Sequence, residues 1–167
     1  FINSGLDFKT FSTFGKGCSL NILLVKWNIN ALPDKLINNL NEIGDFFFLI
    51  LCGPNEKKIE DDILSKLKKS NYLTLSNKTI YDLVPYLCAS DMYVGNDSFG
   101  SHITSQSGKK SIVMLLDAPR AYTDYSKNYH RMVPKGFNID EITHGTNADP
   151  NLITVEEVIK TINQFRN

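Results

Sequence analysis

The sequence has no excess of charge of either sign. Its 18 basic and 18 acidic residues cancel over 167 residues. Proteins that bind nucleic acid or an anionic membrane usually carry a clear basic surplus. The composition therefore predicts no nucleic-acid partner. The neutral composition does not exclude a local phosphate-binding site, because such a site needs only a few N–H groups and one or two cations.

Long apolar runs and clustered cysteines are also missing. The longest apolar run, Phe46 to Cys52, is far shorter than the ~20 residues that a transmembrane helix needs, and no signal-peptide pattern is present. The other cysteines, Cys18 and Cys88, lie far away in the sequence. This spacing predicts buried thiols in a reducing cytosol rather than disulfides or a metal centre. We expect no metal and no cofactor.

The composition fits one globular domain, with 42% hydrophobic and 22% charged residues. The chain begins FINSGLDF without an initiator methionine, which favours a fragment of a longer protein. Glycines interrupt residues 1–19, so we expect a linker or a partial element there. Residues 20–167 are expected to form the folded domain.

Apolar runs of strand length alternate with amphipathic segments of helix length. Strands are expected at residues 20–25, 46–51, 72–75, 91–95 and 111–116. Helices are expected near residues 33–44, 56–69, from 79, 99–107 and 154–165, with residues 118–145 irregular. The expected buried residues include Ile59, Ile63, Leu64 and Leu67 on the second helix, and Leu83, Val84, Leu87 and Cys88 on the third. Such alternation predicts an α/β fold, a Rossmann-like doubly wound parallel sheet of strand order 3-2-1-4-5.

The most informative stretch is a strand, a polar turn and a short helix within residues 93–107. The polar residues at the end of this strand and the start of this helix are Asp97, Ser98, Gly100, Ser101 and His102. Open α/β sheets bind ligands at this edge, and the free N–H groups of a helix amino terminus attract anions such as phosphate. Each residue also has a purely structural interpretation, as a helix cap, a turn residue or a satisfied histidine.

Two further candidates follow earlier strands. Glu56 comes after the second strand and could hold ribose hydroxyls, or it could simply be a favourable acid in the first turn of a helix. Lys26 follows the first strand and could reach a diphosphate, or it could be a solvated surface lysine.

The order of these parts resembles the carboxyl-terminal half of the bacterial heptosyltransferases, glycosyltransferase family 9. The matching segments are Lys26-Trp27, Gly53-Pro54-Asn55-Glu56, Leu75-Ser76-Asn77-Lys78-Thr79 and residues 91–102. The family pattern Asp-Ser-Gly-x-x-His is similar to Asp97-Ser98-Phe99-Gly100-Ser101-His102. Here the glycine has moved by one place, and Phe99 occupies its position. Lys109-Lys110 stands where the family usually has a proline.

The resemblance implies one half of a two-domain GT-B enzyme that builds lipopolysaccharide core. A nucleotide-diphosphate sugar, with an ADP-sugar favoured, would bind this half. Asp97 would contact the sugar, and the residues from Ser98 to His102 would contact the diphosphate with Lys26. Glu56 would contact the ribose, and Ser76 with Thr79 would lie in the base-binding loop.

By the same resemblance, the glycan or lipid-linked acceptor and the catalytic base would belong to an amino-terminal domain, so the catalytic residue stays unknown. The family implies metal-independent, inverting transfer. It also implies a location in the cytoplasm or at the inner face of the inner membrane. We expect this chain alone to be inactive.

Two other functions stay open. One is a stand-alone, non-enzymatic nucleotide-binding or interaction domain of flavodoxin-like topology. The other is a nucleotide-sugar epimerase, which would need acid and base carboxylates in its cleft that the sequence does not identify. The tyrosines at positions 122, 125 and 129 could shape an acceptor-side wall, although surface packing is favoured. His130 and His144 receive no role.

Overall fold

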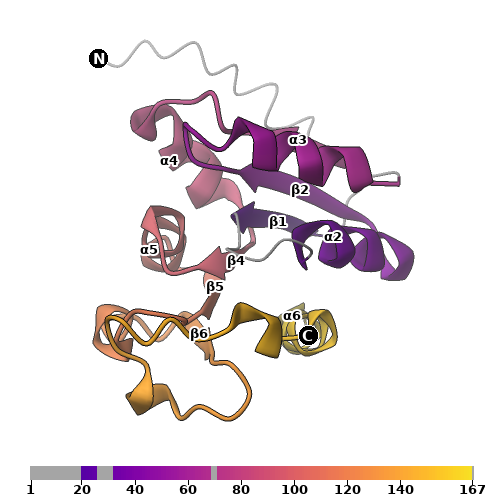
Figure 1. The fold of residues 1–167 in the computed structure, drawn as a ribbon. Coiled ribbons are helices and arrows are strands. Elements are labelled where there is room, and N and C mark those ends of the chain that lie inside the picture. The colour runs from indigo at the N-terminus through magenta and orange to yellow at the C-terminus, as the bar shows by residue number, and fades with distance from the viewer. Residues whose placement is uncertain (1–19, 26–31, 69–70, 167) are drawn as a thin grey trace.

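The chain, in a computed structural model, forms one six-stranded sheet flanked by helices (Figure 1). The structure describes residues 20–25, 32–68 and 71–166. Its strands are β1 (Leu20–Val25), β2 (Phe46–Leu51), β3 (Asn71–Thr74), β4 (Met92–Asn96), β5 (Lys110–Met114) and β6 (Tyr129–Met132). Its α-helices are α2 (Leu32–Ile43), α3 (Lys57–Lys66), α4 (Ile80–Ala89), α5 (Phe99–Gln106) and α6 (Val155–Arg166). Short 3-10 helices cover Arg120–Tyr122, Ile139–Glu141 and Pro150–Leu152.

All neighbouring strands run parallel, in the order β3-β2-β1-β4-β5-β6. The predicted order 3-2-1-4-5 is confirmed, and so is the Rossmann-like class. The sixth strand was not predicted. Residues 118–145 were expected to be irregular, but Tyr129–Met132 pairs with β5 through residues such as Ile112 and His130. Its four residues, YHRM, show no apolar run, which is why the pattern missed it.

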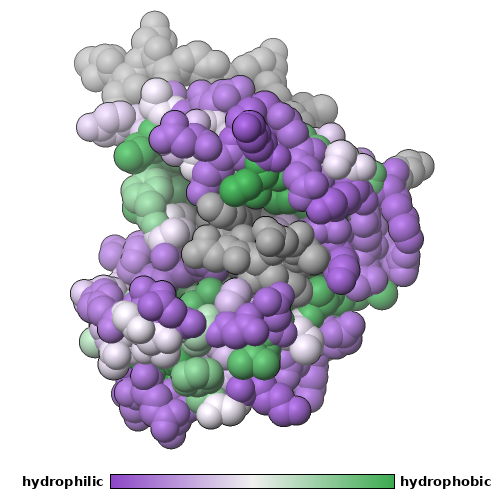
Figure 2. Space-filling model, viewed as in Figure 1, coloured by the Kyte–Doolittle hydropathy of each residue, from purple (hydrophilic) through white to green (hydrophobic). Residues whose placement is uncertain are grey.

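Two hydrophobic clusters lie on opposite faces of the sheet. Helices α2, α3 and α6 cover one face, where Phe46, Phe48 and Ile50 of β2 point. Helix α4 covers the other face, where Leu49 of the same strand points, and α5 packs beside it. This alternation within one apolar run explains why β2 reads as continuously hydrophobic, since a parallel strand is buried on both sides. Figure 2 shows hydrophilic side chains over the outward faces of α2 and α3.

The predicted helix boundaries are confirmed to within a few residues. Thr79 caps α4 by accepting a hydrogen bond from the backbone N–H of Asp82 at 3.3 Å. Thr154 and Glu157 form the expected capping box at α6, with reciprocal hydrogen bonds of 2.9 and 3.2 Å. Gly108 follows α5 with φ +87°, a left-handed conformation that favours glycine and ends the helix.

Two predicted core positions are wrong. Cys88 is exposed, because Leu83 and Leu87 point at the sheet and the next residue is rotated by about 100° around the helix. Ile59 is 37% exposed, and its neighbour Glu60 is buried instead, at 2% exposure. Cys52 is buried as expected, whereas Cys18 lies outside the described residues. No helix in the described part of the chain is both long and apolar enough to cross a bilayer.

Candidate functional site

A cleft of about 570 Å³ lies at the carboxyl edge of the sheet. Its walls come from the segment after β2, the segment between β3 and α4, and the turn between β4 and α5. Three predicted site segments therefore meet in one cleft. The predicted site residues that line it are Glu56, Ser76, Asp97, Ser98 and Gly100, and Thr79 lies with them.

The wall after β2 is a tight turn closed by Glu56. Its carboxylate Oε2 accepts a hydrogen bond from the backbone N–H of Gly53 at 2.7 Å, and its own N–H donates to the carbonyl of Gly53 at 3.0 Å. A Cβ on Gly53 would sit 3.1 Å from the Glu56 carboxyl carbon, so glycine allows this close approach. Glu56 thus lies at the start of α3 with its carboxylate at the cleft.

The wall after β3 is held by a buried carboxylate that the sequence analysis did not select. The hydroxyl of Ser76 donates to Glu60 and accepts from the backbone N–H of Cys52 at 3.3 Å. Lys57 donates to the other Glu60 oxygen at 2.8 Å, and the acceptors Glu60 and Asp61 raise the pKa of Lys57. Because its only proton goes to Glu60, Ser76 reaches the cleft as part of the wall rather than as a free donor.

Asp97 lies on the opposite wall, after β4. Its side chain is only 11% exposed, and its Oδ1 lies 3.2 Å from Nε2 of His102. The hydroxyl of Ser101 lies 3.4 Å from the same oxygen but only 2.7 Å from the carbonyl of Ser98. Since a serine hydroxyl has one proton, Ser101 donates mainly to that carbonyl. The contact with Nε2 of His102 is therefore the shorter of the two side-chain contacts that Oδ1 of Asp97 makes among the described residues.

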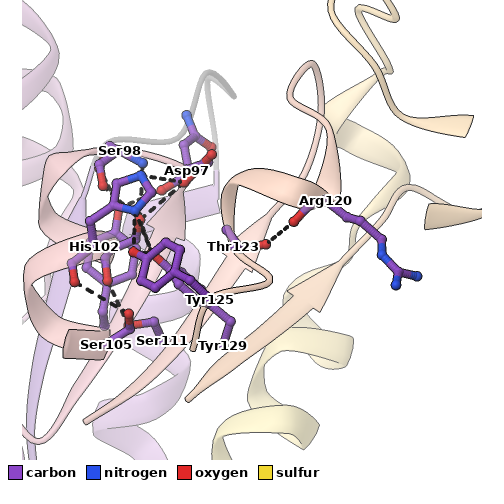
Figure 3. A network of polar contacts seen from close by, with 12 residues as sticks. Asp97, Ser98, His102, Ser105, Ser111, Arg120, Thr123, Tyr125 and Tyr129 are labelled. Atoms are coloured by element: carbon purple, nitrogen blue, oxygen red, sulfur yellow. Dashed lines mark hydrogen bonds and ion pairs between the residues drawn. The ribbon is translucent and has the colours of Figure 1, made fainter. Parts of the chain in front are cut away.

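Behind His102 lie two tyrosines from the region before and within β6 (Figure 3). Nδ1 of His102 lies 2.5 Å from the hydroxyl of Tyr125 and 2.9 Å from that of Tyr129. The two hydroxyls are 2.9 Å apart. Tyr129 is 8% exposed, and burial raises the pKa of its phenol, which keeps it protonated. Surface packing is therefore wrong for Tyr129, while Tyr125 remains 51% exposed.

Two further cleft residues were not selected from the sequence. Asn96, the last residue of β4, lines the cleft, and its buried Oδ1 has no hydrogen-bond partner among the described residues. Phe99 lines the cleft with 40% of its surface exposed. No sequence pattern marks Asn96, whereas Phe99 stands where the family 9 pattern that this stretch resembles has a glycine.

The remaining predicted residues divide into two groups. Ser101 and His102 do not line the cleft but support Asp97 from behind. Lys26 lies outside the described residues. Within the described ranges, no three His, Cys, Asp or Glu side chains gather to form a metal site; metal independence stays a prediction.

The fold places the chain among Rossmann-like α/β domains of the kind found in GT-B glycosyltransferases. The ADP-heptose lipopolysaccharide heptosyltransferase II of E. coli matches with a TM-score of 0.72 and 16% identity, over 99% of this chain and 52% of that one. A family 9 glycosyltransferase of Veillonella parvula matches with a TM-score of 0.74 and 14% identity, over 95% of this chain and 50% of that one.

A third match is the UDP-GlcNAc 2-epimerase of Neisseria meningitidis, with a TM-score of 0.64 and 16% identity, over 94% of this chain and 38% of that one. No protein-family model and no curated protein sequence matches. At these identities the matches show the fold. The chain spans about half the length of the heptosyltransferase structures that it matches. The fold expected from the family 9 resemblance is confirmed.

Proposed function

We propose that this chain is the carboxyl-terminal, nucleotide-sugar-binding half of a bacterial glycosyltransferase of family 9. The observation that carries the proposal is the single cleft in which the loop of Glu56 and the turn of Asp97 meet at the amino end of α5. This is the sheet edge at which doubly wound folds bind nucleotides. The fold match with a heptosyltransferase that spans nearly the whole chain supports the same function.

The cleft offers a distinct group to each part of a nucleotide-diphosphate sugar. Backbone N–H groups of the first turn of α5, around Gly100, would bind the diphosphate, because a helix amino terminus favours anions. The carboxylate of Asp97 would accept hydrogen bonds from sugar hydroxyls, and Glu56 would accept them from the ribose. Lys26 and His102 complete the predicted set. Two solved structures of one protein of similar fold, the E. coli heptosyltransferase WaaC, carry ADP and ADP-2-deoxy-2-fluoro heptose, so we propose an ADP-sugar, with heptose the first choice.

In the proposed reaction, an acceptor hydroxyl attacks the anomeric carbon and the nucleotide diphosphate leaves. The negative charge that develops on the leaving diphosphate would be stabilised by the oriented N–H groups of α5, without a metal. The acceptor, a glycan or lipid-linked glycan of lipopolysaccharide, and the catalytic base would come from another domain, in the cytoplasm or at the inner face of the inner membrane. This chain alone would bind the donor without transferring its sugar.

Calorimetric titration of the chain with ADP, UDP, GDP and their sugars tests the proposal. We expect at least one nucleotide sugar to bind more tightly than about 1 mM, a free energy of about −4 kcal/mol, and we expect Asp97→Ala to abolish that binding. Asp62→Asn is the matched control, because Asp62 is exposed and, among the described residues, its carboxylate pairs only with Lys66 along α3. The proposal fails if no nucleotide sugar binds, or if both variants bind like the wild type.

The epimerase is a second candidate, because two carboxylates, Glu56 and Asp97, line one cleft and the UDP-GlcNAc 2-epimerase shares the fold. An epimerase needs no acceptor. Incubation of the chain with UDP-GlcNAc, followed by proton NMR of the sugar, distinguishes the two functions. A new epimer would establish the second candidate, whereas an unchanged sugar spectrum together with measurable donor binding supports the first.

A further inference from the structure

Both ring nitrogens of His102 are engaged by side chains from different parts of the chain. Nε2 faces Oδ1 of Asp97 at 3.2 Å, from the turn before α5. Nδ1 faces the hydroxyls of Tyr125 and Tyr129. Tyr125 lies in the loop before β6 and Tyr129 is the first residue of β6, both more than twenty residues after His102. Figure 3 shows the imidazole between the carboxylate and the two phenols.

The protons in this cluster can be assigned by counting donors and acceptors. Asp97 as a carboxylate only accepts, so the 3.2 Å contact with Oδ1 assigns a proton to Nε2. In neutral imidazole Nδ1 is then the acceptor, and a tyrosine hydroxyl donates to it. The second tyrosine donates to the oxygen of the first across 2.9 Å. The raised pKa of Tyr129, caused by burial, agrees with a phenol that keeps its proton.

We propose that Tyr125 and Tyr129 are positioning residues: they hold His102 as the Nε2–H tautomer, and His102 in turn orients the carboxylate of Asp97 toward the donor sugar. This inference rests on the proposed function, because it gives Asp97 a ligand. It differs from the predicted role of His102 as a direct phosphate donor.

As a consequence, the two carboxylate oxygens of Asp97 have different roles. Oδ1 is held by His102 and lies near Ser101. No residue in the described part of the chain donates a hydrogen bond to Oδ2. Asp97 lines the cleft, so a carboxylate fixed through Oδ1 keeps Oδ2 for a sugar hydroxyl. Binding then loses less conformational entropy than it would with a carboxylate free to rotate.

The first experiment separates the sugar from the nucleotide. Calorimetry compares the affinities for the nucleotide diphosphate and for its sugar in the wild type, Tyr125→Phe, Tyr129→Phe, the double variant and Tyr122→Phe. Tyr122 is the matched control, because its hydroxyl lies 2.8 Å from Nε2 of His144, a similar pair that involves neither His102 nor Asp97. We expect the double variant to bind the nucleotide sugar about threefold to tenfold more weakly, with binding of the bare diphosphate within twofold of the wild type.

Equal weakening for both ligands would overturn the proposal, because it would indicate a general loss of structure. So would an unchanged affinity for the sugar in the double variant. Circular dichroism melting of each variant accompanies the titrations. Tyr→Phe keeps the aromatic ring, which for Tyr129 is part of a hydrophobic cluster.

A second measurement does not depend on any ligand. The chain has three histidines, so long-range ¹⁵N–¹H spectra of their rings can be assigned by His130→Gln and His144→Gln. We expect the neutral imidazole of His102 to show a protonated Nε2 and an unprotonated, hydrogen-bonded Nδ1. The Nδ1 shift should move in the double variant and stay in place in Tyr122→Phe, which should instead move Nε2 of His144.

A protonated Nδ1 in neutral His102, or an Nδ1 shift that the double variant leaves unchanged, would overturn the positioning role even if nucleotide sugars bind. If the shifts behave as expected but no nucleotide sugar binds the wild type, the proposed function fails, and with it the purpose assigned to the cluster.

Discussion

Two carboxylates on opposite walls of the cleft are held in different ways. Glu60 is 2% exposed, forms an ion pair with Lys57 at 2.8 Å and accepts a hydrogen bond from the hydroxyl of Ser76. Asp97 is 11% exposed and has no lysine or arginine partner among the described residues, only His102 and Ser101. A buried carboxylate with a full set of partners joins segments, whereas one held through a single oxygen can bind a ligand. Glu60 therefore stabilises the wall of the cleft, whereas Asp97 is placed to bind a ligand in it.

The largest expected effect comes from Glu60→Ala. This change removes the acceptor of the Ser76 proton and the partner of Lys57, so we expect the free energy of unfolding to fall by about 3 kcal/mol. Urea denaturation monitored by circular dichroism measures the loss. Asp61→Ala, which removes the more exposed partner of Lys57, should change stability by less than about 0.5 kcal/mol. Equal losses in the two variants would refute the structural role of Glu60.

Asp97→Asn should weaken ligand binding and leave stability nearly unchanged, the reverse of Glu60→Ala. The neutral amide accepts weaker hydrogen bonds than a carboxylate does, so we expect nucleotide-sugar affinity to fall by about tenfold to a hundredfold. Calorimetry measures the affinity. Urea denaturation should give a free energy of unfolding within about 1 kcal/mol of the wild-type value. A variant that loses several kcal/mol of stability but keeps its affinity would make Asp97 a structural residue like Glu60.

Phe99→Gly places a glycine at the first position of α5, where the family 9 pattern that this stretch resembles has one. Glycine lets the backbone approach a ligand closely, so we expect ADP to bind roughly threefold more tightly by calorimetry. The cost in helix stability should stay below about 1 kcal/mol, as thermal melting can verify. Phe137→Gly, at another partly exposed phenylalanine outside the cleft, is the control. Weaker ADP binding in Phe99→Gly would show that the ring itself contacts the nucleotide.

The smallest expected effect concerns His130, which contrasts with the carboxylate-paired His102. His130 lies on β6 against the ring of Phe165, with 5.3 Å between ring centroids, and burial lowers its pKa. Below about pH 6.5 the unfolded chain binds this proton more readily than the folded chain. Stability should therefore decrease as the pH falls through this range, and His130→Gln should remove that part of the decrease. Urea denaturation at pH 7.5 and pH 5.5 measures the difference, and an equal decrease in both proteins would contradict it.

The fold was more predictable from the sequence than the site was. Apolar runs such as that of β2 are buried on both faces, so they identify strands and a parallel sheet by themselves. The local motif selected Ser101 and His102, but nothing local linked the tyrosines to His102, because Tyr125 and Tyr129 reach it only through the pairing of β6 with β5. Glu60 had a usable signal that was missed: it is an acidic residue in the first turn of α3, four residues after Glu56, which caps that helix.

The most direct test of the central claim is an NMR titration of the ¹⁵N-labelled chain with an ADP-sugar. The account predicts that the backbone amides of Gly53, Asn55, Glu56 and residues 97–101 shift together at submillimolar to millimolar ligand, and that the amides on the outward face of α6 do not. No shift up to several millimolar ligand, or shifts concentrated on α6, would contradict a nucleotide-sugar site in the cleft of Glu56 and Asp97.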